Sequence, residues 1–190
     1  MFERVKRDNS DSVKKATSVL ESGGIIAYPT DTIYGFGCDA RNEKAIERLN
    51  NIKGRSAPMS VLCPSFQNVS SWIDLPNHEK AIVEKQIKPK TTLIVPVKSN
   101  VVSNLILGNG NTLGIRISNH PFCISVANNY PSPITTTSVN RSGREPLSDP
   151  HKIELEFSNE IELCIDEGVI KGKGSKIYKY ENQSWIPIRS

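Results

Sequence analysis

Stretches with the periodicity of helices and of strands alternate along most of this 190-residue chain. Apolar residues three and four positions apart predict helices, and short apolar runs bounded by Gly or Pro predict buried strands. We expect helices over residues 11–22, 42–52, 77–87, 121–129 and 151–157. We expect strands over residues 25–28, 58–63, 91–97, 113–117, 134–137, 161–165, 176–180 and 185–188. Elements alternate early and strands dominate late, which predicts one α/β domain with a mixed rather than purely parallel sheet.

Charge and composition narrow the class of protein only slightly. The formal net charge is +4, a mild excess that fits phosphate or nucleic-acid binding and equally an ordinary solvated surface. No apolar run approaches the roughly 18 residues that a membrane helix needs. Residues 1–8 are largely charged and lack the apolar core of a signal peptide. We therefore expect a cytoplasmic protein without membrane contact.

The cysteines and histidines do not follow the spacing of metal or disulfide sites. The cysteines are Cys38, Cys63, Cys123 and Cys164, and the histidines are His78, His120 and His151. No CxxC or HxxxH pair occurs among them. Isolated thiols in a cytoplasmic protein are usually buried and reduced, so we expect core residues in place of metal ligands.

Two polar clusters interrupt the apolar pattern. Lys53 and Arg55 lie at the predicted end of a helix, and Ser138 and Asn140 follow a predicted strand. An arginine can grip phosphate with two hydrogen bonds while a lysine acts as a point charge. Ser138 and Asn140, two residues apart on an extended segment, would point to the same side. Taken alone, the cations could simply complement the helix dipole, and the second cluster could be an ordinary turn.

Arg116 is an isolated charge within the strand-like stretch 113–117. A charge in such a position must either extend its head group to the surface or pair with an anion. It is therefore a stronger candidate for a ligand contact than either polar cluster by itself.

The standard nucleotide-binding motifs are not present. Residues 168–175 superficially resemble a Walker A loop, but a glycine separates Lys173 from Ser175. Residues 35–37 open like a dinucleotide-binding fingerprint, but Ala40 stands where its third glycine belongs. Any nucleotide site must therefore use a different arrangement.

The order of four motifs closely resembles the YrdC-like family of threonylcarbamoyl-AMP synthases. The motifs are PTDTIYGFG (29–37), KGR (53–55), GIRISNHPF (114–122) and TSVNRSG (137–143). The resemblance extends from about residue 27 to residue 189. It implies a single YrdC-like domain over residues 1–190, with a twisted mixed sheet flanked by helices and a basic concave face. It also implies that L-threonine, bicarbonate and ATP, the last with Mg²⁺, form threonylcarbamoyl-AMP and pyrophosphate.

The resemblance also implies partners. In the family, the product passes to a transferase complex that makes the t6A modification on the adenosine beside the anticodon of tRNAs reading codons that begin with A. The expected enzyme is thus a nucleotidyltransferase with a tRNA-modifying threonylcarbamoyl transferase complex as its partner, and weak RNA or tRNA binding is compatible with it. One alternative is an RNA-binding module without catalysis. Another is a carbamoyl transferase, whose larger relatives carry extra domains and zinc-finger cysteines that this chain lacks.

Matching the family motifs position by position implies specific roles. The residues assigned to L-threonine are Thr32, Arg116, Ser138 and Ser175, with Arg116 suited to the carboxylate. The residues assigned to ATP are Lys53, Arg55, Thr112, Asn140, Ser148 and Arg189. Lys53 and Arg55 are the expected catalytic pair because they would neutralise charge on the phosphates. No side chain is assigned as a metal ligand.

The sequence departs from the family pattern in two places. The loop after Arg55, residues 56–59, is shorter than the family form, and residues 87–92 keep only the final threonine of a W-P-G-P-x-T segment. We expect these departures to change loop geometry and substrate affinity more than the chemistry.

Overall fold

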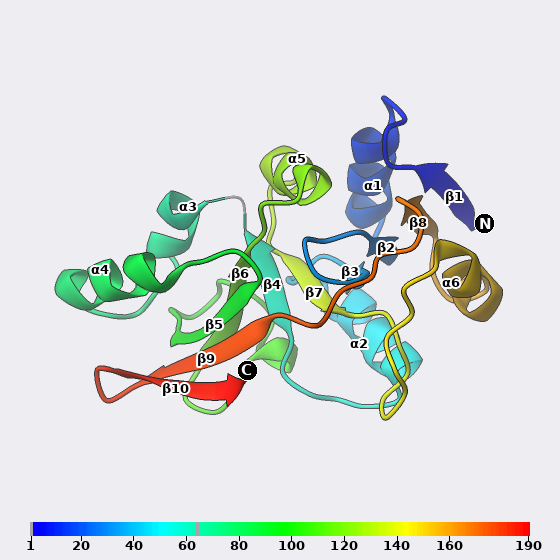
Figure 1. Ribbon diagram of the computed structural model, residues 1–190. Coiled ribbons are helices and arrows are strands. Elements are labelled where there is room, and N and C mark those ends of the chain that lie inside the picture. Colours follow the sequence, from blue (N-terminus) through cyan, green and yellow to red (C-terminus); the bar gives the residue numbers. More distant parts are fainter. Residues whose placement is uncertain (1, 64) are drawn as a thin grey trace.

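The computed structural model describes residues 2–63 and 65–190, and its centre is a ten-stranded sheet (Figure 1). The strand order is β1-β8-β2-β3-β7-β4-β6-β5-β9-β10. Parallel pairs such as β4–β6 and β5–β9 stand beside antiparallel pairs such as β5–β6 and β3–β7. The predicted mixed α/β fold is therefore confirmed.

The strands are β1 (Glu3–Lys6), β2 (Ile26–Tyr28), β3 (Gly35–Gly37), β4 (Ser60–Cys63), β5 (Thr91–Pro96), β6 (Thr112–Ile117), β7 (Ile134–Ser138), β8 (Leu163–Asp166), β9 (Lys176–Glu181) and β10 (Ser184–Arg189). The helices are α1 (Ser12–Glu21), α2 (Glu43–Lys53), α3 (Phe66–Ser70), α4 (Asn77–Gln86), α5 (Pro121–Asn129), α6 (Pro150–Phe157) and a 3-10 turn at Asn104–Ile106. Every predicted element is present, and its ends differ from the prediction by at most two residues.

The elements that the periodicity did not predict are short. β1 has one buried residue, Val5, between charged neighbours, and it is held by parallel pairing with the distant β8. β3 begins at Gly35 and ends at Gly37, and the sequence pattern presents both glycines as loop residues. A Cβ at position 37 would lie 2.7 Å from a ring carbon of Tyr28, so this glycine permits close packing of β2 on β3. α3 and the 3-10 turn span only one or two turns of backbone.

Alternation along the strands divides the core into two clusters, one on each face of the sheet. On β6, Leu113 and Ile115 join the first cluster, to which α2, α4 and α6 also contribute. On the opposite face, α1 and α5 pack over residues of β2 and β8 such as Ile26 and Leu163 (Figure 1). Because side chains alternate along a strand, Arg116 faces away from the first cluster, toward the part of this second face where the candidate site lies.

The thiols are part of this packing. All four cysteines are unpaired and buried, as expected for reduced core residues. Burial raises the pKa of Cys63 and Cys164 to about 12, so their reactive thiolate forms are rare near neutral pH. Among the helices of residues 2–63 and 65–190, none is long and apolar enough to cross a membrane.

Candidate active site

A cavity of about 190 Å³ opens on the second face of the sheet, against β3, β4, β5, β6 and β7. Its volume is below the roughly 300–1,000 Å³ of sites for larger ligands, so it would enclose an amino acid and leave a bulkier ligand partly outside. Six of the ten predicted site residues line it: Thr32, Arg55, Arg116, Ser138, Ser175 and Arg189. The strand alternation explains much of this lining, since Ser60, Thr92 and Arg116 each precede or follow a residue of the first core cluster.

The cavity lining is rich in cationic side chains. Three guanidinium groups, those of Arg55, Arg116 and Arg189, line it, and none of the described lining residues is acidic. Burial and the charge of Arg116 lower the pKa of Arg189, which places two mutually repelling cations beside one space. Such an arrangement becomes favourable when anionic groups enter.

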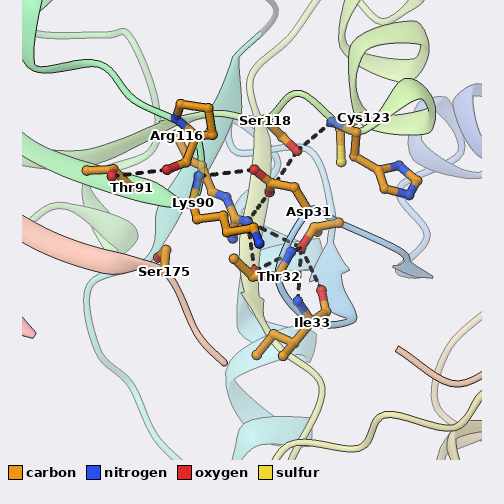
Figure 2. Close-up of polar contacts among 12 residues, drawn as sticks. Asp31, Thr32, Ile33, Lys90, Thr91, Arg116, Ser118, Cys123 and Ser175 are labelled. Carbon is orange, nitrogen blue, oxygen red and sulfur yellow. Dashed lines mark hydrogen bonds and ion pairs between the residues drawn. The ribbon is translucent and has the colours of Figure 1, made fainter. Parts of the chain in front are cut away.

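Arg116 is held by the loop between β2 and β3 (Figure 2). Its Nη2 donates to Thr32 Oγ1 at 2.7 Å and to Thr30 Oγ1 at 3.3 Å, and it forms an ion pair with Asp31. Ser118 Oγ donates to the same Asp31 oxygen at 2.9 Å. Of the two alternatives for Arg116, the structure shows pairing with an anion, and the anion is a side chain of the PTDTIYG motif.

The loop itself is shaped by Thr30. Its hydroxyl oxygen accepts from the backbone N–H groups of Thr32 and Ile33 at 3.1 and 3.3 Å. Local bonds of this kind fix a turn without help from the sheet. The turn places the Thr32 hydroxyl beside Arg116 and inside the cavity lining.

Lys53 connects the two polar clusters that the sequence separates. It is the last residue of α2, and Gly54 ends the helix in a left-handed conformation with φ of 67°. Its ammonium donates to Ser138 O at 2.7 Å and to Asn140 Oδ1 at 2.7 Å. The side chain is 2% exposed and lies behind the cavity wall. Burial and the nearby Arg55 charge lower the pKa of Lys53 to about 8.

A β-bulge brings Arg189 to the cavity. Pro187 pairs with Tyr178 and Arg189 with Ile177, so β10 carries one extra residue between them. The shift puts Arg189 on the same face as Ile177, which lines the cavity. Its Nε donates to Ser175 O at 2.8 Å and its Nη2 to Ser175 Oγ at 3.2 Å. Ser175 also shares a 2.7 Å hydrogen bond with Thr92, the final threonine of the altered 87–92 segment.

Residues 167–175, here called the crossover segment, join β8 to β9. Figure 1 shows this segment in orange, passing in front of β2 and β3. Tyr34 Oη accepts from Glu167 N and donates to Gly168 O, both at 2.9 Å. A Cβ at Gly172 would lie only 1.8 Å from Thr32 O. The segment can therefore cross the loop between β2 and β3 only with glycine at this position. The stretch that superficially resembles a Walker A loop thus contributes Gly174 and Ser175 to the cavity lining.

The remaining predicted residues lie outside the cavity lining. Asn140 is directly behind it, bonded to Lys53 and to Ser138 Oγ. Ser148 accepts at its carbonyl from Ile170 N of the crossover segment. Thr112 begins β6, where its hydroxyl donates to Asn109 O. Their assignment to ATP stays a prediction.

Several residues that shape the site were not singled out from sequence. Asp31 and Tyr34 lie inside the PTDTIYG motif, so their membership of the motif could have marked them as site residues. Ser118 likewise lies in GIRISNHPF. Thr30 and Asp31 orient other side chains, so composition and periodicity gave no reason to choose them.

The donor set does not fit a metal held by the protein. The described cavity lining offers guanidinium and hydroxyl groups, whereas Mg²⁺ prefers carboxylate oxygens and phosphates. Within the described chain, no three side chains of His, Cys, Asp or Glu converge to hold a metal ion. The cavity suits anions.

Comparison with known families agrees with this geometry. Residues 18–190 match the Sua5/YciO/YrdC family model, whose description is "Telomere recombination". The chain belongs to this family. As a family member it is similar to proteins named threonylcarbamoyl-AMP synthase, including one from Hydrogenovibrio crunogenus that is 32% identical over 184 residues. That match covers 94% of this chain and 97% of the relative.

Solved structures of family members share the fold. Pyrococcus abyssi Sua5 in complex with L-threonine superposes with a TM-score of 0.85 and 26% identity. That match covers 98% of this chain but 56% of the Sua5 chain. E. coli YciO superposes with a TM-score of 0.88 and 22% identity. That match covers 100% of this chain and 95% of the YciO chain, and it supports the fold alone.

Proposed function

We propose that this family member is an L-threonylcarbamoyladenylate synthase. It would condense L-threonine, bicarbonate and ATP into threonylcarbamoyl-AMP and pyrophosphate, which makes it a nucleotidyltransferase. The product would serve t6A formation on tRNA through a separate threonylcarbamoyl transferase complex.

The observation that carries this proposal is the cavity with three arginines and no acidic residue in its described lining. Two of these arginines, Arg116 and Arg189, are fixed by hydrogen bonds, whereas Arg55 is exposed at the mouth. Arg116, at the buried end of the cavity, suits a small carboxylate. Arg55, at the mouth, suits a polyphosphate. The relatives named threonylcarbamoyl-AMP synthase, and the Sua5 structure with L-threonine, support the same pair of ligands.

In the proposed complex, the threonine carboxylate meets Arg116 and its hydroxyl lies among the hydroxyls of Thr32, Ser138 and Ser175. The threonine amine attacks carbon dioxide derived from bicarbonate, loses a proton and becomes a carbamate. A carbamate oxygen then attacks the α-phosphorus of ATP, and the bond to the pyrophosphate oxygen breaks. No covalent enzyme intermediate is required, so the cavity acts by positioning and by charge neutralisation.

Arg55 and Arg189 would neutralise the phosphates in this reaction. Lys53 would add positive potential from behind the Ser138 segment, because its ammonium is already bonded to Ser138 O and Asn140 Oδ1. Asn140 would thus be positioned by Lys53 as well as by Ser138. Magnesium is proposed to enter with ATP as part of the substrate, since the cavity lining is suited to anions. The use of the product on tRNA and the unpaired cysteines favour a cytoplasmic reaction.

Pyrophosphate release tests the proposal. ATP and bicarbonate are supplied with L-threonine, L-serine, L-valine or no amino acid. Release that requires both threonine and bicarbonate is the expected result. ATP binding without any threonine-dependent release would overturn the proposal and favour an RNA-binding module, whose RNA affinity should weaken steeply as salt is raised.

A further inference from the structure

Asp31 is a carboxylate that the proposed chemistry does not use. Its side chain is 6% exposed, and Asp31 is not among the residues that line the cavity. It forms an ion pair with Arg116 and accepts hydrogen bonds from Ser118 Oγ at 2.9 Å and from Lys90 N at 3.1 Å (Figure 2). The carboxylate is therefore fixed from three directions, by β6, by the residue just after it and by the backbone that leads into β5.

These bonds also orient the guanidinium. All hydrogen bonds that the described chain makes to the Arg116 side chain end at one nitrogen, Nη2. The Arg116 side chain is 7% exposed, and its Nε is buried without a protein partner. Because Nη2 is occupied by the loop and Nε is buried, Nη1 is the nitrogen left to donate to a ligand in the cavity. An arginine presented in this way can accept a carboxylate without rearranging.

We infer that Asp31 is a positioning residue, which fixes Arg116 through Nη2 so that the N–H groups of Nη1 receive the carboxylate of the amino-acid substrate. This inference rests on the proposed function for the identity of that substrate. It assigns Asp31 to recognition of the amino acid and to no step in the transfer of the nucleotide.

The opposite arrangement is conceivable on charge alone. Asp31 and a substrate carboxylate are both anions, so Asp31 could compete for Arg116 and weaken substrate binding. The two arrangements predict changes of opposite sign when the charge of Asp31 is removed. The supports from Ser118 and Lys90 favour positioning, because they hold the carboxylate in place even when a ligand draws on Arg116.

The test measures steady-state kinetics and L-threonine binding for Asp31→Asn, which keeps the size of the side chain and removes its charge. We expect the KM for L-threonine to rise at least about tenfold, with kcat and the KM for ATP within about twofold of wild type. An unchanged or lower KM for L-threonine in folded protein would overturn the inference. A residue that only supports the fold would not separate the two substrates in this way.

Ser118→Ala serves as a second variant in case Asp31→Asn does not fold. It removes one support of Asp31 and retains the ion pair, so the KM for L-threonine should rise by a smaller factor, about threefold, with the KM for ATP unchanged. Asp39→Asn is the matched control, because Asp39 accepts from Tyr130 Oη at 2.8 Å outside the cavity lining. It should leave both KM values unchanged.

A double-mutant cycle tests whether Asp31 acts through Arg116. In an Arg116→Lys background, Asp31→Asn should change the KM for L-threonine by less than about twofold, because the guanidinium that Asp31 orients is gone. Full additivity would show that Asp31 acts independently and would overturn the inference. If the wild-type enzyme itself shows no threonine-dependent turnover, the proposed function fails first, and that outcome is separate from any effect of Asp31.

Discussion

Two parts of the same face of the sheet have opposite character. Over β2 and β8, side chains such as Ile26 and Leu163 are buried beneath α1 and α5 and form an apolar core. Over β5 and β6, Thr92 and Arg116 occupy the same face but line a polar cavity. We call these the covered part and the open part.

The difference lies in what the alternating positions must satisfy. In the covered part an apolar side chain is stabilised by removal from water. In the open part, a buried charge without a partner would lower the stability of the fold. Arg116 is tolerated because Asp31 and Thr30, in the loop between β2 and β3, supply acceptors. The comparison predicts that mutations in the open part affect substrates, whereas mutations in the covered part affect stability.

Removing a cation from the mouth of the open part should have the largest effect on turnover. Arg55 is exposed, and no hydrogen bond or ion pair from its side chain occurs within the described chain. Arg55→Ala should therefore lower kcat about 100-fold, the loss of one strong electrostatic donor, with the free energy of unfolding little changed. Lys44→Ala, an exposed cation on α2, is the control and should keep wild-type turnover. Near-normal turnover of Arg55→Ala would contradict the claim that the open part acts on the substrates.

The covered part should respond in the opposite way. Leu163 is 1% exposed within the second core cluster, so Leu163→Ala should lower the free energy of unfolding by about 2–5 kcal/mol. Chemical denaturation measures this loss, and turnover below the unfolding transition should stay within about twofold of wild type. A large loss of turnover in folded Leu163→Ala would show that the two parts are not separable.

A mutation in the crossover segment tests whether its packing against Thr32 positions the open part for L-threonine. Gly172→Ala would place a methyl group against Thr32 O and displace the segment from the loop between β2 and β3. We expect the KM for L-threonine to rise about tenfold, because a displacement of about 1 Å can cost more than that. Val169→Ala, at an exposed position of the same segment, should have no such effect. Equal kinetics for both variants would mean that the segment does not position the site.

The smallest expected effect is on pH dependence. The pKa of Lys53 is lowered to about 8 by burial and by Arg55, so its ammonium is present below that pH and lost above it. Because the Lys53 charge assists the proposed reaction, turnover should fall about twofold between pH 7 and pH 8. Because the unfolded chain keeps this proton up to about pH 10.4, the contribution of Lys53 to stability should rise over pH 8–10 as activity falls.

Lys53→Met is the control for this pH dependence, since it has no group that titrates in this range. It should lose the rise in stability and retain only a reduced, flatter activity profile. Parallel pH profiles of the variant and the wild type would contradict the assignment to Lys53.

Sequence alone predicted the elements with a strong periodicity, and it predicted the chemistry through the order of the motifs. It failed where tertiary contacts decide the conformation. β1 depends on β8 for its pairing, and Arg189 reaches the cavity only through a one-residue bulge in β10. Neither feature leaves a periodic signal.

The same limit applied to the site. Arg116 could be selected because a charge within an apolar strand needs an explanation. Asp31 could not, because an aspartate in a loop is ordinary until its partners are known. Lys53 and Ser138 were proposed as two clusters, and only the fold brings them within hydrogen-bond distance.

The most direct test of the central claim is detection of the product itself. The protein is incubated with L-threonine, ATP and ¹³C-labelled bicarbonate, and the nucleotides are separated rapidly and analysed by mass spectrometry. The account predicts a threonine-dependent adenylate that carries one ¹³C atom in wild type and is strongly reduced in Arg55→Ala. Turnover of ATP that yields no labelled adenylate would contradict it.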